Sequence, residues 1–142
     1  MKKGQAAMEF IMTYGWAILV VLVAIAALAY FGVLSPGKYL PEKCIPAAGI
    51  SCNSFKATTT GVDVILQNSL GKDITVTGIN FPDATCSDTF TTTLVNGDSG
   101  TFNIACTLTS GSKINSDMVI TYDEVNGLGN LTNTGTLSTE VQ

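Results

Sequence analysis

The stretch from Phe10 to Leu34 reads FIMTYGWAILVVLVAIAALAYFGVL and contains no charged residue. A helix needs roughly 20 apolar residues to cross the hydrocarbon layer of a membrane. Thirteen of these 25 residues are Leu, Ile, Val or Phe, so insertion gains on the order of 4–8 kcal/mol. The segment has no polar face, which excludes a helix that lies on a soluble core with one wet side. It therefore predicts one long, apolar helix that inserts into a membrane.

Charges and helix breakers on either side of this segment set its orientation and its end. The basic residues on its N-terminal side are Lys2 and Lys3. Positive charges stay on the cytoplasmic side, so we expect residues 38–142 outside the cell. Downstream, the cluster Ser35-Pro36-Gly37 breaks a helix, and we expect the helix to end near Leu34.

Three interpretations of the N-terminal region compete. It is a plain single-pass anchor, or a secretory signal removed by cleavage after Ala29, or a leader that is cut ahead of the apolar run so that the helix is retained. An ordinary secretory signal has an apolar core of about 7–15 residues, shorter than this one. A plain anchor has no need of Glu9, the only charged residue between Lys3 and Lys38. The third interpretation accounts for both the length and the carboxylate.

The N-terminus reads Lys2-Lys3-Gly4-Gln5-Ala6-Ala7-Met8-Glu9-Phe10, and it resembles the class III signal peptide of archaeal type IV pilins. In that family a membrane aspartic peptidase cuts between Gly and Gln, and the matching bond here is Gly4–Gln5. Gln5 and Glu9 stand where the family pattern has them, whereas Ala7 and Thr13 replace a Ser and a Leu. The resemblance covers residues 1–34.

This resemblance implies a division of the chain and a set of partners. Residues 1–4 would be a cleaved leader, and residues 5–34 a retained helix that spans the membrane before assembly and forms the filament core afterwards. The expected partners are further copies of the chain, a prepilin peptidase, the pilus assembly machinery and the membrane.

The resemblance also gives Glu9 a role in assembly. In pilins of this kind the matching Glu takes part in assembly, and here it would pair with the new α-amino group of Gln5 in a neighbouring subunit. At about 4 Å and an effective dielectric near 20, that attraction is about 4 kcal/mol before desolvation costs. The alternative is that Glu9 only caps the first helical turn at the membrane interface.

Beyond the breaker cluster, short segments of alternating polarity replace the long apolar run. We expect residues 35–56 to be a connector with a disulfide loop, and residues 57–142 to be an antiparallel β-sandwich of immunoglobulin-like topology. Two hairpins are predicted, one joining 62–67 to 74–79 and one joining 90–95 to 102–106. Further strands are expected at 118–122 and 131–141. The predicted fold class is thus α+β, a long N-terminal helix followed by an all-β domain.

Four cysteines lie outside the predicted membrane segment, at Cys44, Cys52, Cys86 and Cys106. An exported domain favours disulfides, and three pairings are possible. We expect Cys44–Cys52, which pins the connector to the domain, and Cys86–Cys106, which ties two strands together. A four-cysteine metal site is the rival, but the Cys-x2-Cys spacing usual in zinc sites is missing.

Composition argues against several classes of function. The chain has no His, no Arg and a formal net charge of −4, which makes acid–base catalysis and nucleic-acid binding poor candidates. We expect no enzyme, no cofactor and no metal site. Asn130-Leu131-Thr132 is the only N-glycosylation sequon, so Asn130 is a candidate glycan site.

The resemblance to archaeal type IV pilins implies a structural subunit of an extracellular, type IV pilus-like filament, assembled by bundling of N-terminal helices and serving surface adhesion. The precursor would reside in the cytoplasmic membrane. The alternative from a different class is a single-pass, membrane-anchored extracellular binding module that does not polymerise.

Overall fold

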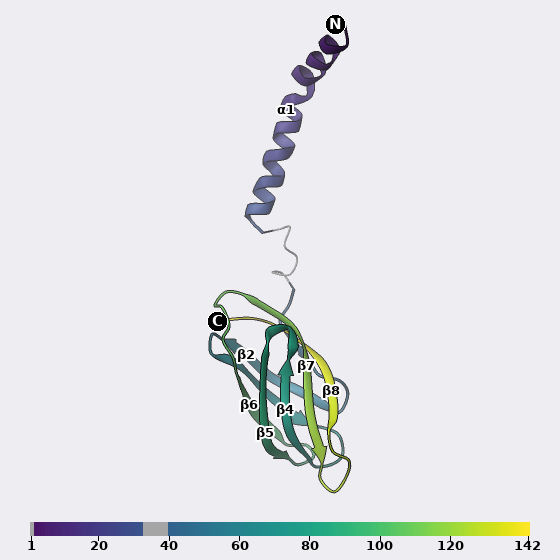
Figure 1. Cartoon of the computed structure of the whole chain (residues 1–142), viewed down its shortest axis with the longest axis vertical. Coiled ribbons are helices and arrows are strands. Elements are labelled where there is room, and N and C mark those ends of the chain that lie inside the picture. Colours follow the sequence, from purple (N-terminus) through teal and green to yellow (C-terminus); the bar gives the residue numbers. More distant parts are fainter. Residues whose placement is uncertain (1, 33–39) are drawn as a thin grey trace. The chain divides into compact units, whose positions relative to one another are not determined.

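The computed structural model describes residues 2–32 and 40–142, which fall into two compact units, Met1–Leu40 and Pro41–Gln142 (Figure 1). The first unit contains one long helix and the second contains only β-strands and a short 3-10 turn. The predicted fold class, an apolar N-terminal helix followed by an antiparallel all-β domain, is confirmed.

Helix α1 spans Lys2–Tyr30 and ends earlier than the sequence predicted. The Phe31 N–H donates to the Ala27 carbonyl at 2.9 Å, and the Gly32 N–H donates to the Ala29 carbonyl at 3.1 Å. Gly32 has a φ of 72°, the left-handed conformation in which glycine commonly follows the last turn of a helix. The helix therefore ends at Tyr30 and is followed by the left-handed Gly32, whereas the sequence predicted an end near Leu34. The cluster Ser35-Pro36-Gly37 lies outside the described residues.

The β-domain consists of eight antiparallel strands in two sheets (Figure 1). The larger sheet has the order β1-β8-β7-β4-β5 and the smaller has the order β2-β3-β6. The strands are β1 (Lys43–Ile45), β2 (Ile50–Thr58), β3 (Gly61–Asn68), β4 (Ile74–Phe81), β5 (Cys86–Leu94), β6 (Ser99–Ala105), β7 (Lys113–Glu124) and β8 (Leu131–Glu140), with the 3-10 turn η2 (Pro82–Ala84) after β4.

Strands β2 to β8 follow an immunoglobulin-like order. The smaller sheet pairs β3 with β2 and β6, while the larger pairs β4 with β5 and β7, and β7 with β8. The chain thus changes sheet between β3 and β4, between β5 and β6, and again between β6 and β7. Such crossings are typical of Greek-key sandwiches. Strand β1 adds a short fifth strand beside β8.

The core lies between the two sheets and is built by the alternation that the sequence shows. Val62, Val64 and Leu66 of β3 are fully buried, and so are Met118 and Ile120 of β7 in the opposite sheet. These side chains belong to one continuous hydrophobic cluster. Burial at every second residue is the pattern of strands with one face on a core and one face in solvent.

Both predicted hairpins are wrong, although the strands themselves exist. Strand β3 pairs with β2 and β6, so the segment 62–67 is not joined to the segment 74–79 of β4. Likewise β5 pairs with β4, and β6 pairs with β3 in the other sheet. In each case the turn carries the chain from one sheet to the other. Alternating burial reveals which face is inside, but the same pattern fits a neighbour in either sheet.

The β-domain also begins earlier than expected. Strands β1 and β2 occupy much of the segment 35–56 that was assigned to a connector, and the compact unit starts at Pro41. The alternation in β2 is interrupted by a register shift between Cys52 and Ser54. An extra residue in a strand hides its period from the sequence. The final strand, in contrast, was predicted at 131–141 and is found at Leu131–Glu140.

Candidate functional site: the surface of helix α1

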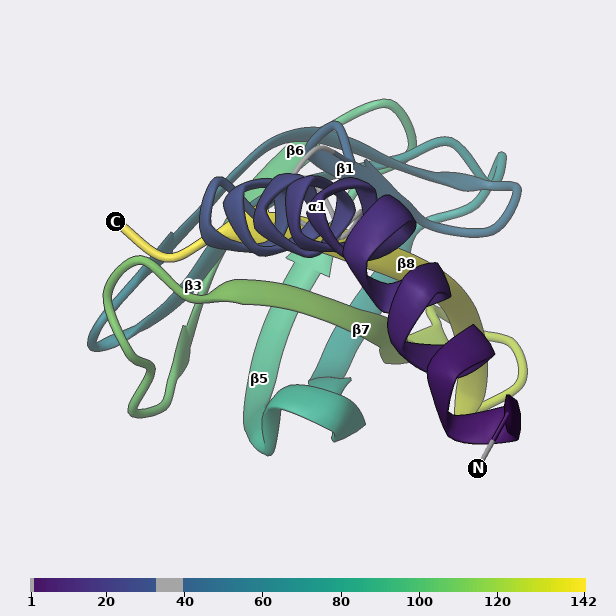
Figure 2. The ribbon, with the colours of Figure 1, turned by 90° about the horizontal axis from the view of Figure 1, so that it is seen from above.

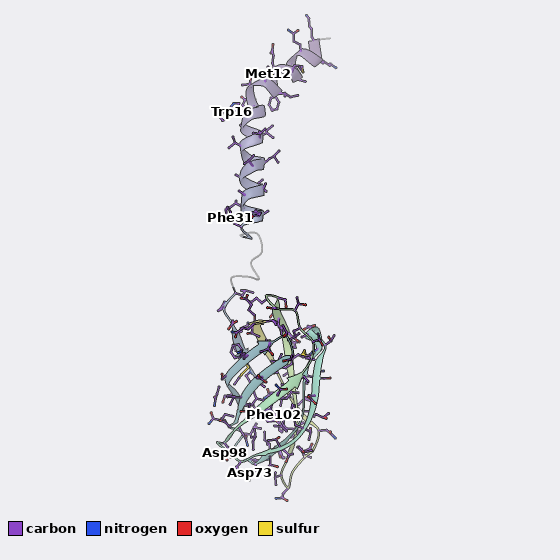
Figure 3. All side chains as sticks on the ribbon, turned by 90° about the vertical axis from the view of Figure 1, so that its left-hand side faces the viewer. Met12, Trp16, Phe31, Asp73, Asp98 and Phe102 are labelled. Atoms are coloured by element: carbon purple, nitrogen blue, oxygen red, sulfur yellow. A yellow bond between two sulfur atoms is a disulfide. The ribbon has the colours of Figure 1, made fainter. Side chains whose placement is uncertain are left out.

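The surface of α1 is apolar on all sides and none of its residues is buried. Met12, Trp16 and Phe31 project outward (Figure 3), with exposed fractions of 80%, 70% and 71%. The other large apolar side chains exposed on α1 are Met8, Phe10, Ile11, Tyr14, Ile18, Leu19, Val20, Val21, Leu22, Val23, Ile25, Leu28 and Tyr30. Soluble monomers rarely expose a contiguous apolar surface of this extent. By length and composition, the 29 residues of α1 suffice to cross a membrane.

One side of α1 carries a shallow apolar groove lined by Phe10, Tyr14, Ala17, Ile18, Val21 and Leu22. The Phe10 and Tyr14 rings form one wall, with centroids 4.9 Å apart. Ala17 is the smallest residue of this lining. Small residues of this kind let a second helix approach closely in an apolar medium.

The axis of α1 bends in its N-terminal part, near Met12 and Trp16 (Figures 2 and 3). The Thr13 hydroxyl donates to the Glu9 carbonyl at 2.8 Å, and this back-bonding of a Thr side chain to residue i−4 often bends helices. Gly15 follows two residues later, where an added Cβ would meet only Ile11 at 3.8 Å. This bend was not predicted from the sequence, although Thr13 and Gly15 inside an apolar run were the available signal.

Gly4, Gln5 and Glu9 all lie in the first turns of α1. Gly4 stands in open space, because an added Cβ would meet no atom within 4 Å. Gln5 and Glu9 are four residues apart, so their side chains lie on the same face of the helix. The predicted cleavage residues Gly4 and Gln5 and the predicted assembly residue Glu9 thus lie at the same exposed helix end. Since terminal turns fray at little cost, the Gly4–Gln5 bond can reach an extended conformation.

The Glu9 side chain is exposed, and its carboxylate has no hydrogen bond or ion pair among residues 2–32 and 40–142. A carboxylate surrounded by apolar side chains needs a partner once water is removed. The basic residues within the same helix are Lys2 and Lys3, about two turns before it. A group supplied from outside the chain is therefore the natural partner of Glu9 in an apolar setting.

Both predicted disulfides are present in the β-domain. Cys44 bonds to Cys52 with Cα atoms 5.9 Å apart, and Cys86 bonds to Cys106 with Cα atoms 5.3 Å apart. Disulfides persist in oxidising compartments. Together with the apolar helix, which acts as an anchor or a signal sequence, they indicate an extracellular location for this domain.

Asn130 lies apart from these residues, in the turn between β7 and β8. Its side chain is exposed, its φ is 54°, and its backbone N–H donates to the Asp123 carboxylate at 2.6 Å. No group of three or more His, Cys, Asp or Glu side chains that could hold a metal occurs within the described ranges.

Two buried asparagines were not identified from the sequence. The Asn68 side chain is fully buried and donates to the carbonyls of Lys72 and Leu94, at 2.7 and 3.0 Å. The Asn133 side chain accepts from the Ala47 N–H at 2.9 Å and donates to the Ala47 carbonyl at 3.1 Å. Both hold loops onto the sandwich through hydrogen bonds to backbone groups of those loops. Asn68 precedes a Ser and a Gly in a predicted turn, which was the only hint in the sequence.

Comparison with known proteins adds no assignment: no family model matches the chain, and no curated protein matches it.

Proposed function

We propose that this protein is a structural subunit of an extracellular, type IV pilus-like filament in which the α1 helices of many copies bundle into a core. The observation that carries this proposal is the apolar surface of α1, which is exposed on every side. Lipid covers such a surface while the helix is in a membrane. Outside the membrane, the α1 helices of further copies can bury this apolar surface.

The energy available from such bundling is sufficient. Fully burying one large apolar side chain gains about 1.5–3 kcal/mol. Association costs roughly 4–15 kcal/mol in lost translational and rotational freedom. Burial of a fraction of the large side chains exposed on α1 therefore exceeds the cost of adding a subunit. The groove at Ala17 and Ile18 offers a place where helices can approach closely.

Glu9 supplies the register of the bundle in this proposal. After cleavage at Gly4–Gln5, each subunit carries a new α-amino group one helical turn before Glu9. Pairing with the amine of a neighbouring copy neutralises the carboxylate inside the core. Because an unpaired charge in an apolar medium is strongly unfavourable, this pairing selects one axial position of each helix against the next.

The β-domains would then cover the filament and present their outer faces to other cells and surfaces, which is the basis for the proposed role in adhesion. The rival function is a single-pass anchor that holds one β-domain at the cell surface. The length and apolar composition of α1, which suffice for a membrane span, also favour this single-pass anchor. The two functions differ in whether the protein leaves the membrane.

The test is the Glu9→Ala variant expressed in the native cell, with filaments sheared off and sedimented in the absence of detergent. We expect the wild-type chain in the sheared fraction and a loss of at least about tenfold for the variant, with an unchanged amount of protein in the membrane. Glu140→Ala is the matched control, since it also removes one exposed carboxylate, at the end of β8, and should leave the yield unchanged. Wild-type protein that is extracted only with detergent would instead support the single-pass anchor.

A further inference from the structure

The two sheets of the β-domain end in four edge strands, β1 and β5 in the larger sheet and β2 and β6 in the smaller. An edge strand presents unpaired backbone N–H and C=O groups that can pair with another strand. Proteins block unwanted pairing with short strands, charged side chains, prolines or bulges.

Three of the four edges carry such a block. Strand β1 has only three residues and includes Lys43. Strand β2 has a register shift between Cys52 and Ser54 and an exposed Lys56. Strand β5 has an extra residue opposite Thr77, because its pairing with β4 moves from Val76↔Thr92 to Gly78↔Thr89. It also places Asp88 on the core side, opposite the buried Ile79.

Strand β6 carries none of these blocks. Its sequence, Ser99-Gly100-Thr101-Phe102-Asn103-Ile104-Ala105, contains no charge and no proline. Its register with β3 is unbroken from Gly61↔Ala105 to Gln67↔Ser99. Within the described part of the chain, β3 is its only strand partner, so its other edge has no ladder. The contrast with β1, β2 and β5 marks this edge as one that is left open.

We propose that β6 is a docking site for a second copy of this chain, formed by antiparallel pairing of β6 with β6 of the other copy. A two-fold axis at Phe102 places Thr101 opposite Asn103 of the second copy and Ser99 opposite Ala105. Exposed Thr and Asn side chains then meet at two symmetric positions, where they can form hydrogen bonds. No charged residue is brought opposite another.

The charge distribution favours this edge for contact between identical copies. Residues 41–142 contain four Lys and ten Asp or Glu, so most faces of two copies repel each other. Asp63, on the neighbouring strand β3, is already engaged, since it accepts a hydrogen bond from the Asn103 side chain and lies opposite Lys56 in the register. The exposed Asp98 precedes Ser99 and lies outside the paired residues 99–105. Two copies can therefore meet at the β6 edge without the repulsion between acidic side chains that is expected at most other faces.

The two-fold symmetry of this contact determines which subunits it can connect. Subunits within one polar filament all point the same way, so a two-fold contact between them would have to break that polarity. The pairing would instead connect subunits of two filaments that cross or run in opposite directions. The connection between filaments rests on the proposed function, and it makes adhesion homotypic, that is, between copies of the same protein. The pairing of β6 with β6 does not itself depend on filament formation.

Charge substitutions at the paired positions test the register. The variant Thr101→Lys with Asn103→Lys puts Lys opposite Lys twice across the two-fold axis. The variant Thr101→Glu with Asn103→Lys puts Glu opposite Lys twice, and it keeps the same Asn103→Lys substitution beside Asp63. The matched control, Thr91→Lys with Thr93→Lys, adds the same charge to exposed threonines on the blocked edge strand β5.

Association is measured by analytical ultracentrifugation of the full chain in detergent, so that the result does not require filament formation. We expect the wild-type chain and the β5 control to dimerise, the double Lys variant to associate at least about tenfold more weakly, and the Glu/Lys variant to recover. Bundling of sheared filaments seen by electron microscopy should follow the same order. A monomeric wild-type chain, an equal loss in the β5 control, or no recovery in the Glu/Lys variant would overturn the proposal.

Discussion

Cys86, the first residue of β5, and Cys106, the residue that follows β6, form a disulfide with Cα atoms 5.3 Å apart, and this bond joins the edge strands of the two sheets. Cys44 of β1 and Cys52 of β2 do the same with the other pair of edge strands. Backbone ladders hold strands together within a sheet, but they do not hold one sheet to the other. The two disulfides therefore tie the two sheets to each other on both sides of the sandwich, and they leave the outer backbone edge of β6 without a partner among the described strands.

Removal of either disulfide should destabilise the β-domain without changing its fold. For loops of 20 and 8 residues, the chain-entropy estimate is about 3.3 kcal/mol for the longer loop and about 2.5 kcal/mol for the shorter one. The variants are Cys86→Ser with Cys106→Ser, and Cys44→Ser with Cys52→Ser. Urea unfolding of the full chain in detergent, followed by tyrosine fluorescence, measures the loss. A loss well below about 1 kcal/mol in both variants would show that the sheets are held by the core alone.

Gly135 should tolerate no side chain, because β1 crosses close to it. An added Cβ would overlap the Ile45 carbonyl oxygen and the Pro46 Cα. Gly135→Ala should therefore push β1 away from β8 and lower the free energy of unfolding by about 1–3 kcal/mol. Gly78→Ala is the control within the same sheet, since its nearest atom would be the Asp88 carbonyl oxygen at 3.6 Å. Equal stability of the two variants in urea would contradict the close approach.

The buried Asn68 should be among the most sensitive polar residues of the β-domain. Its side chain donates to two carbonyls and accepts from the Leu70 N–H at 3.0 Å. Asn68→Ala removes all three hydrogen bonds, one of which is fully buried, at a cost of about 2–4 kcal/mol in unfolding free energy. Asn53→Ala, on the exposed outer face, should change it by less than about 0.5 kcal/mol. Similar losses for both would argue that water reaches the loop around Asn68.

Asn130 should carry an N-linked glycan in the native protein. It is exposed in the β7–β8 turn and begins the single sequon of the chain. Thr132→Ala removes the sequon and keeps Asn130, so the intact mass of the native protein should drop by the mass of one glycan. Thr134→Ala, on the same exposed face of β8, should leave the glycan in place. An unmodified Asn130 peptide from wild-type protein would contradict this prediction.

The helix was predictable from the sequence, because an uninterrupted apolar run specifies both its length and its environment. The error at its C-terminus has a physical cause: a single glycine in the left-handed conformation, Gly32, ends the helix before the breaker cluster. The disulfide pairing was also predicted correctly, but Cys86–Cys106 was expected to join the two strands of one hairpin, whereas it joins strands of different sheets. The sheet to which each strand belongs could not be predicted from the sequence. The turns after Asn68 and Leu94 resemble hairpin turns but carry the chain across the core to the other sheet.

The features that matter most for docking were also hidden from the sequence. The open edge of β6 emerges only when the strand order is known, because the segment itself resembles any other alternating strand. The bulges that block β2 and β5 are likewise defined by their partners, as at Val76 and Gly78. Glu9 differs in this respect, since a lone carboxylate beside a long apolar run stands out without any structure.

The N-terminal peptide of the native protein is the most direct test of the filament account. It is obtained by mass spectrometry of material sheared from cells without detergent. The account predicts a chain that starts at Gln5, with α1 retained and a free α-amino group available to Glu9. A chain that starts at Tyr30, or an intact N-terminus found only in detergent-extracted membranes, would contradict it.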